Sequence, residues 1–219
     1  MAAGAEAFIR AHTRPRHPEL VPEIVLQLAD EITPIWQASE AWLQARDLAP
    51  PFWAFAWPGG QALARHVLDN PALVAGRAVL DFAAGCGLAA IACAQAGAVS
   101  VEAADTDPLA VAALRLNAAS NGVAVTALAA DLVGSACRWD LILCGDICYE
   151  APMTRHVLPW LRRMAESAEV WIADPGRAYL PLCDLESRGR IVVATSLELE
   201  DRTEREVGLY RLAALSPPP

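Results

Sequence analysis

The chain has 219 residues, of which 55% are hydrophobic and 20% charged, and its formal net charge is -9. This length and apolar content are typical of one folded domain and exclude a disordered segment. No apolar run reaches the roughly 18 to 20 residues that cross a bilayer, and no basic run is longer than two residues. We therefore expect neither a membrane protein nor a nucleic-acid-binding protein.

The start of the chain and its cysteines indicate a reducing compartment. The first 16 residues contain Glu6 and no apolar stretch typical of a secretory signal. The six cysteines include no CxxC pair and are mostly set in apolar surroundings, as reduced core thiols are. We expect a cytoplasmic protein with no disulfides and no metal site.

The first 50 residues carry a helical pattern that two prolines, Pro22 and Pro34, interrupt. The apolar residues that recur at helical spacing are Leu20, Ile24, Leu28, Ile32 and Ile35. We interpret residues 1–50 as a helical N-terminal cover on a core formed by 51–219, so that residues 1–219 form a single domain.

Strand-like and helix-like segments alternate from Arg77 onward. The expected strands are 79–82, 99–104, 123–130, 139–145 and 170–173, and the expected helices are 88–97, 108–122 and 152–165. A further helix is expected at 61–69, before the first of these strands. This alternation predicts an α/β fold, with a parallel sheet and helices on both faces.

The end of the chain follows a different pattern. Residues 190–199 and 204–215 are strand-like and are separated by the polar turn 200–203, with no helix between them. Such segments form an antiparallel hairpin. Five βα units followed by a hairpin indicate the Rossmann-like, seven-stranded, mostly parallel sheet of class I methyltransferases, because dinucleotide-binding folds continue with parallel units.

A glycine-rich turn joins the first of these strands to its helix, in the sequence VLDFAAGCG from Val79 to Gly87. Gly85 and Gly87 allow a ligand to approach the backbone and the helix N–H groups. The turn suits the adenosyl group of a methyl donor. However, Gly85-x-Gly87-x-x-Ala90 also satisfies the relaxed dinucleotide fingerprint, and an ordinary tight turn is a third alternative.

Acidic residues follow the next two strands. Asp105 lies 20 residues after the turn, where a carboxylate can accept both ribose hydroxyls of either cofactor. Asp107 precedes Pro108 and is expected to cap a helix. Asp131 is placed to accept the adenine 6-amino group, which favours S-adenosylmethionine over a dinucleotide; a solvent-facing turn residue is the alternative.

Asp146 and Tyr149 follow the fourth strand, at the sheet edge where α/β proteins bind ligands. Methyl transfer requires above all a nucleophile positioned near the methyl group. With a lysine amine as acceptor, Asp146 would orient the amine and Tyr149 would supply a second polar contact. The alternative is a helix-capping Asp and a half-buried Tyr.

Two further motifs are candidates for this site. Trp57, beside a Pro-Gly-Gly turn containing Gly60, is expected to pack over the methionine arm of the cofactor, whose carboxylate would face the helix N–H groups. Core packing is the alternative for Trp53 and explains it nearly as well. The Asp174-Pro-Gly-Arg177 segment either borders the substrate entrance or is an ordinary turn with a capping Asp.

With these residues in place, the chain resembles the lysine methyltransferases that modify the β-subunit of electron transfer flavoprotein. The resembling segments are 52–65, 68–71, 79–87, Asp105–Pro108 with Asn117 and Asn121, 145–149 and 174–177. The resemblance implies cofactor contacts at Trp57, Gly60, Asp81, Gly85, Asp105 and Asp131, and a lysine-side role for Asp146 and Tyr149. The sequence departs from the wider methyltransferase pattern at Ala83, where a glycine is usual.

These observations together predict an S-adenosylmethionine-dependent protein-lysine N-methyltransferase. The resemblance implies the electron transfer flavoprotein β-subunit as the protein substrate, and we expect a monomeric enzyme. The first alternative is a methyltransferase of a ribosomal protein or a small amine. The second is an NAD-dependent oxidoreductase or a nucleotide sensor that lacks catalysis.

Overall fold

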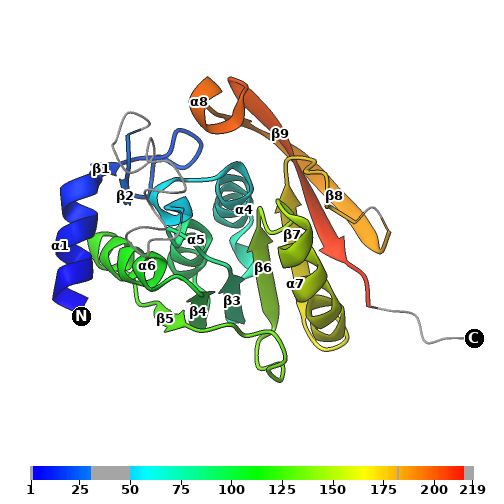
Figure 1. The fold of residues 1–219 in the computed structure, drawn as a ribbon. Coiled ribbons are helices and arrows are strands. Elements are labelled where there is room, and N and C mark those ends of the chain that lie inside the picture. Colours follow the sequence, from blue (N-terminus) through cyan, green and yellow to red (C-terminus); the bar gives the residue numbers. More distant parts are fainter. Residues whose placement is uncertain (1, 31–49, 182, 215–219) are drawn as a thin grey trace, which may run out of the picture.

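The computed structural model describes residues 2–30, 50–181 and 183–214, and a seven-stranded sheet forms its centre (Figure 1). The strands are β3 (Ala78–Phe82), β4 (Ser100–Asp105), β5 (Thr126–Ala129), β6 (Leu141–Gly145), β7 (Glu169–Asp174), β8 (Leu185–Ala194) and β9 (Glu204–Leu212). Their order is β5-β4-β3-β6-β7-β9-β8, parallel from β5 to β7, with β9 antiparallel to β7 and β8. The predicted mostly parallel sheet with a C-terminal antiparallel hairpin is confirmed.

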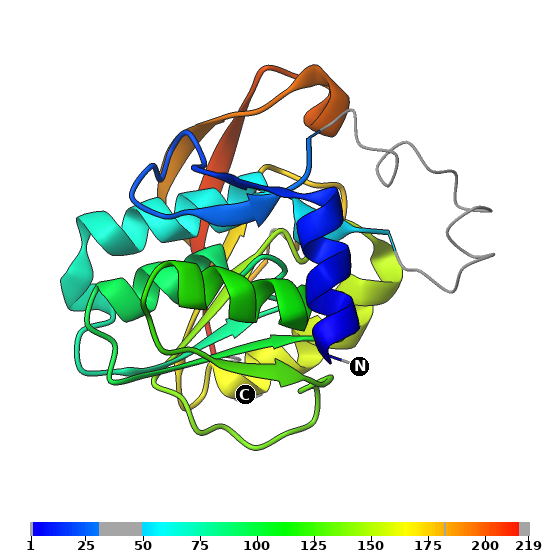
Figure 2. The ribbon, with the colours of Figure 1, turned by 90° about the vertical axis from the view of Figure 1, so that its left-hand side faces the viewer.

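Helices cover both faces of the sheet, as predicted. They are α4 (Pro58–Asp69), α5 (Leu88–Gln95), α6 (Pro108–Ser120) and α7 (Ala151–Met164). Successive strand residues point to opposite faces, so Val79 joins the core under α4, α5 and α6, whereas Leu80 joins the core under α7. On the α7 side the rings of Phe82 and Trp160 lie 5.1 Å apart. Figure 2 shows α4 and α6 on the face turned toward the viewer.

The start of α6 lies at the carboxyl end of β4 and has the predicted cap. Asp107 is the N-cap residue, and its Oδ1 accepts a hydrogen bond from the Leu109 N–H at 2.8 Å, with Pro108 in the first turn. A carboxylate here satisfies an N–H that the helix leaves unpaired. The structural role assigned to Asp107 is therefore confirmed.

The N-terminal segment is only partly helical. The helix α1 (Ala2–His12) packs on α6, and a hairpin follows, formed by β1 (Arg14–Arg16) and β2 (Leu26–Leu28). The helix predicted from the spacing of Leu20, Ile24 and Leu28 is wrong, while Ile32 and Ile35 lie outside the described residues. Pro22 in the middle of this stretch removes a helix hydrogen bond, and tertiary contacts decide the rest.

Asn117 of α6 and Asn121, which caps the end of this helix, fix the segment around β2 in its extended form. The Gln27 N–H donates to Asn117 Oδ1 at 2.7 Å, and the Val25 N–H donates to Asn121 Oδ1 at 3.0 Å. Asn117 Nδ2 also donates to the Cys86 carbonyl in the glycine turn at 2.8 Å. Backbone groups that a helix would have satisfied internally are thus paired with side chains.

The C-terminal hairpin contains a helical turn that was not predicted. The short helix α8 (Leu197–Glu200) lies between β8 and β9, and the Ser196 side chain caps it by accepting from the Leu199 N–H at 3.2 Å. The expected uninterrupted strand over 190–199 is therefore wrong, since β8 runs from Leu185 to Ala194. Within the described ranges, no helix is both long and apolar enough to span a bilayer.

Candidate active site

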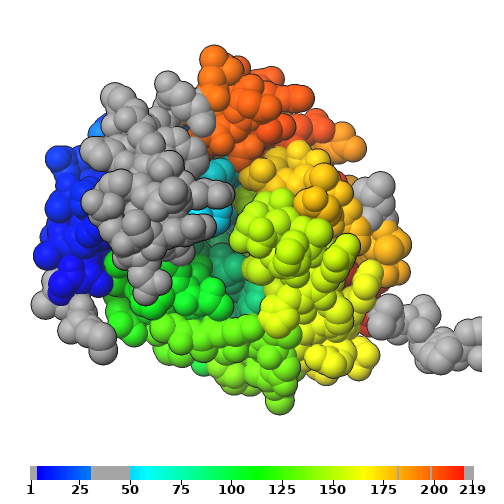
Figure 3. Space-filling view, viewed as in Figure 1, coloured from blue at the N-terminus to red at the C-terminus, as the bar shows by residue number. Residues whose placement is uncertain are grey.

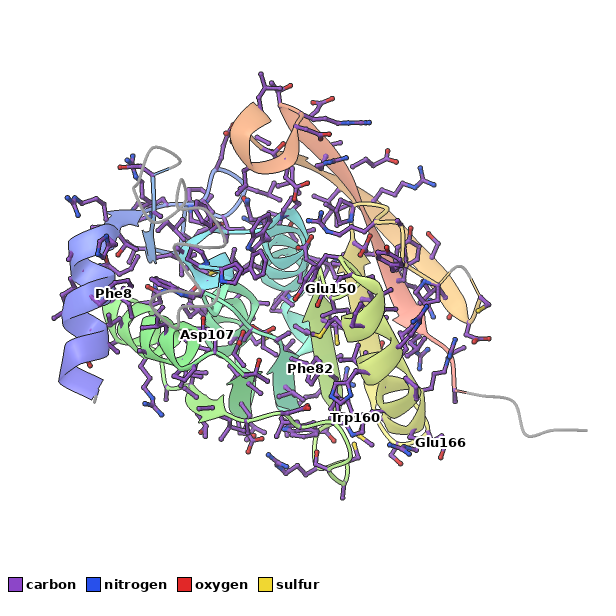
Figure 4. All side chains as sticks on the ribbon, in the orientation of Figure 1. Phe8, Phe82, Asp107, Glu150, Trp160 and Glu166 are labelled. Atoms are coloured by element: carbon purple, nitrogen blue, oxygen red, sulfur yellow. The ribbon has the colours of Figure 1, made fainter. Side chains whose placement is uncertain are left out.

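A cavity of about 430 Å³ opens at the carboxyl end of the parallel strands, and a smaller one of about 60 Å³ shares part of its wall. Figure 3 shows a hollow between the surfaces of α6 and α7, and Figure 4 labels Asp107 and Glu150 where these helices start. The shared wall is Trp57, Ala83, Gly85, Gly145 and Asp146. The larger cavity has the size of a typical small-molecule pocket.

The glycine turn forms the floor of the cavity. Gly85 has φ +52° and lines both cavities, and its N–H donates to Asp105 Oδ2 at 2.9 Å. Asp105 Oδ1 accepts from the Asp107 N–H at 2.9 Å, and the same carboxylate lines the larger cavity. Ala83 also has a left-handed φ of +55°, at the position where the wider pattern has glycine. The structure therefore brings the turn and the ribose-binding candidate together.

Asp81 lies beneath the turn and lines the smaller cavity together with Gly60. Its Oδ2 accepts from the Ala90 N–H at 2.9 Å. Burial raises the pKa of Asp81 to about 8, and the charge of Asp105 adds to this increase. A cation bound nearby would favour the ionised form.

Two predicted cofactor residues, Gly87 and Asp131, line neither cavity. Gly87 has φ +80°, and a Cβ there would come within 2.8 Å of Leu114 Cγ, so packing alone explains this glycine. Asp131 Oδ1 accepts from the Val133 N–H at 2.9 Å, and its Oδ2 lies 2.7 Å from His156 Nε2. The adenine contact of Asp131 stays a prediction.

Asp146 lies on the wall between the two cavities with a left-handed φ of +55°. Its Oδ2 accepts from the Gly59 N–H at 2.6 Å, and its Oδ1 accepts from Arg177 Nη2 at 2.9 Å. Burial raises the pKa of Asp146 to about 6, against the opposing effect of the Arg177 guanidinium. The carboxylate does not cap α7, but by accepting from the Gly59 N–H it pairs a first-turn N–H of α4, so the capping alternative for this residue stays open.

The segment from Asp174 to Arg177, which follows β7, is both a turn with a capping Asp and part of the cavity wall. Asp174 Oδ1 accepts from the N–H groups of Gly176 and Arg177, at 2.8 and 2.7 Å, as a turn-capping residue does. The Arg177 side chain reaches into the cavity and also donates to Glu200 Oε1 at 2.7 Å. Glu200, on α8, was assigned to a polar turn, and no local sequence signal distinguishes it from the neighbouring acids.

Aromatic side chains form the opposite rim of the cavity. The Tyr149 ring is half-exposed and lies 5.6 Å from the ring of Phe52, which is 5.9 Å from that of Trp57. Trp57 Nε1 donates to the Phe52 carbonyl at 2.8 Å. Trp53 lines the cavity but is only 2% exposed and belongs to a core cluster that includes Ile9. Phe52 was not singled out from the sequence.

Comparisons with known proteins identify the class. Residues 62–148 match the family model of ribosomal protein L11 methyltransferase (PrmA). A ribosomal protein L11 methylase from Lactobacillus delbrueckii subsp. bulgaricus is similar, with a TM-score of 0.51 and 24% identity over 72% of this chain and 79% of that one. Magnesium protoporphyrin IX methyltransferase from Synechocystis PCC 6803 with bound SAM has a TM-score of 0.52 and 20% identity, over 69% and 78%. The fold is that of class I S-adenosylmethionine-dependent methyltransferases.

Curated relatives identify the family within this class. The electron transfer flavoprotein beta subunit lysine methyltransferase of Xenopus laevis is 44% identical to this chain over 78% of its length. The Homo sapiens enzyme of the same name is 35% identical over 93% of this chain. The Danio rerio enzyme is 41% identical over 73%. The matches span 70%, 78% and 62% of those proteins, respectively. The chain belongs to the electron transfer flavoprotein beta subunit lysine methyltransferase family.

Proposed function

We propose that this protein transfers methyl groups from S-adenosylmethionine to lysine side chains of the electron transfer flavoprotein β-subunit. The names of its relatives support this substrate. The observation that carries the proposal is the position of Asp146, a carboxylate only 11% exposed on the wall shared by the two cavities. An anionic group at this point suits an acceptor that arrives as an ammonium ion.

The residues around the cavities fit the cofactor. Those that would hold it are Trp57, Gly60, Asp81, Gly85 and Asp105. In the part of the chain that the structure describes, no side chain lies within 4 Å of a Cβ placed on Gly85, and Asp105 offers carboxylate oxygens to ribose hydroxyls. The raised pKa of Asp81 suits a group that becomes charged when a cation binds beside it. When bound, the cofactor supplies an electrophilic methyl group on a sulfonium sulfur.

The acceptor lysine must present a lone pair to that methyl group. Deprotonating a lysine of pKa about 10.4 at pH 7 costs roughly 4 to 5 kcal/mol, which desolvation in the cavity lowers. Asp146 binds and orients the amine, and the half-exposed Tyr149 offers a second polar contact at the rim. Catalysis then comes mainly from holding the nucleophile in line.

Mass spectrometry of the intact β-subunit after incubation with enzyme and S-adenosylmethionine tests this proposal. We expect mass increases in 14 Da steps on lysine, and none with Asp146→Asn. Methylation of a ribosomal protein or a small amine with no change in the β-subunit would contradict the target. Several further points stay predictions. At the site these are the adenine contact of Asp131 and the cofactor role of Gly87. For the whole protein they are the single domain over 1–219, the monomeric state and the cytoplasmic location.

A further inference from the structure

One guanidinium of the site is shared between two carboxylates. Arg177 Nη2 donates to Asp146 Oδ1 at 2.9 Å and to Glu200 Oε1 at 2.7 Å. The two acids come from distant parts of the chain: Asp146 follows β6, and Glu200 ends α8 in the C-terminal hairpin. Arg177 thereby connects the hairpin to the carboxylate that faces the acceptor.

Glu200 is held firmly in this position. Its side chain is 2% exposed, and Arg205 Nε donates to Oε2 at 3.1 Å while Arg205 Nη2 donates to the Glu200 carbonyl at 2.8 Å. A buried carboxylate is costly unless its oxygens are paired, and here each oxygen has an arginine partner. Glu200 therefore provides a fixed acceptor that competes with Asp146 for the same nitrogen of Arg177.

The charge balance shows what this acceptor does for the site. Arg177 paired with Asp146 alone would neutralise the carboxylate, and a neutral pair attracts an ammonium ion only weakly. With Glu200 present, Arg177 is shared between two carboxylates and neutralises Asp146 less completely, while Arg205 pairs with the other oxygen of Glu200. Among the residues that the structure describes, Asp146 Oδ1 accepts one hydrogen bond, from Arg177, and a carboxylate oxygen can accept two.

We propose that Glu200 is a positioning residue for the acceptor lysine, which acts by holding Arg177 so that Asp146 remains an available, negatively charged acceptor. This inference rests on the proposed lysine methyltransfer. It gives the C-terminal hairpin a defined part in substrate binding, because Leu199 and Glu200 of α8 both line the larger cavity.

Steady-state kinetics of Glu200→Gln provides the first test. Arg177 would then pair with Asp146 alone, so we expect KM for the protein substrate to rise about tenfold, with kcat within about threefold. The affinity for S-adenosylhomocysteine should not change. Glu206→Gln is the matched control, because Glu206 is an exposed acid of the same hairpin that pairs with Arg190 at 2.7 Å. An equal effect of the two variants would overturn the proposal.

Two further variants separate positioning from structural support. Glu200→Asp keeps the charge, so KM should stay within about threefold of wild type. This variant remains a test of the proposal even if Glu200→Gln does not fold. In an Arg177→Gln background, Glu200→Gln should change KM by less than about twofold, because the residue acts through Arg177. A raised KM in Glu200→Asp, or additive effects in the double variant, would refute the inference.

An NMR titration tests the same coupling without a protein substrate. The carboxyl carbon of Asp146 is assigned by its loss in Asp146→Asn. The ionisable groups around it are Arg177, Asp174, Cys148 and Glu200. Removing the charge of Glu200 strengthens the effect of Arg177, so the pKa of Asp146 should fall from about 6 in Glu200→Gln.

A pKa of Asp146 that is unchanged or higher in Glu200→Gln would contradict the proposal even if the β-subunit is not the substrate. Conversely, wild-type enzyme that leaves the β-subunit unmodified would contradict the proposed target alone. The titration and the wild-type assay therefore distinguish the two failures.

Discussion

The two halves of the cavity are built in different ways. In the cofactor half, Asp81 accepts from the N–H of Ala90, and Asp105 accepts from that of Gly85, over separations of 9 and 20 residues. In the acceptor half, Gly59 donates to Asp146 across 87 residues. The first half is a local supersecondary structure, whereas the second exists only when distant segments meet.

This difference indicates how each half should respond to change. Most of the cofactor half consists of the glycine turn and the acids at the ends of β3 and β4, so its geometry follows largely from neighbouring strands, a turn and a helix, to which the start of α4 adds Trp57 and Gly60. Side-chain charges from three elements form the acceptor half, where Arg177 bridges Asp146 and Glu200. Substitutions in the first half should therefore change cofactor affinity, and those in the second should change turnover or substrate binding.

The largest effect is expected from Asp146→Asn. Asparagine tolerates the left-handed φ of +55° and can still accept from the Gly59 N–H, but it cannot supply a charge. We expect turnover to fall by at least about a hundredfold, while S-adenosylhomocysteine affinity stays within a few-fold. Calorimetry and a methylation assay measure the two quantities, and unchanged turnover would rule out the proposed role.

Gly59→Ala should strongly destabilise the contact between the halves. A Cβ at this position would lie 2.5 Å from Asp146 Oδ2 and 2.6 Å from the Ala173 carbonyl, so the backbone would have to shift. We expect a loss of about 2 kcal/mol in the free energy of unfolding by urea. Gly60→Ala is the control, because no atom of the described residues lies within 4 Å of a Cβ there. Equal stability of the two variants would show that the close approach is unimportant.

Asp105→Asn should weaken cofactor binding and leave the acceptor half intact. Asn supplies one acceptor oxygen where Asp105 uses two, for the N–H groups of Gly85 and Asp107. We expect the Kd for S-adenosylhomocysteine to rise about tenfold or more, with KM for the protein substrate little changed. Asp107→Asn is the control. Asparagine also caps helices, so the start of α6 should be preserved and the Kd for S-adenosylhomocysteine should stay near the wild-type value. The same Kd in both variants would argue against ribose binding by Asp105.

The smallest expected effect is that of Ala83→Gly. Ala83 has a φ of +55°, which costs about 1 kcal/mol for a residue with a Cβ. Glycine removes this strain, so we expect the free energy of unfolding to rise by up to about 1 kcal/mol. Ala84→Gly, at a neighbour outside the left-handed region, should instead lower it. Destabilisation by both substitutions would mean that Ala83 is not strained.

The sequence by itself determined the sheet, the glycine turn and the acids at the strand ends. Asp105 and Asp146 could be assigned to the cavity because the carboxyl ends of parallel strands meet at one edge. The helix predicted over Leu20 to Leu28 was wrong, because Asn117 of α6 and its C-cap residue Asn121 hold the end of this segment in an extended form. Local periodicity carries no information about such long-range partners.

Only the tertiary structure decided the charge network of the acceptor half, in which Arg177 joins Asp146 to Glu200. Glu200 is one of many acids in a polar stretch, and burial against Arg177 and Arg205 gives it a role that no local pattern predicts. The physical reason is that hydrophobic periodicity and turn chemistry act over a few residues. A charge network instead depends on which side chains folding removes from water together.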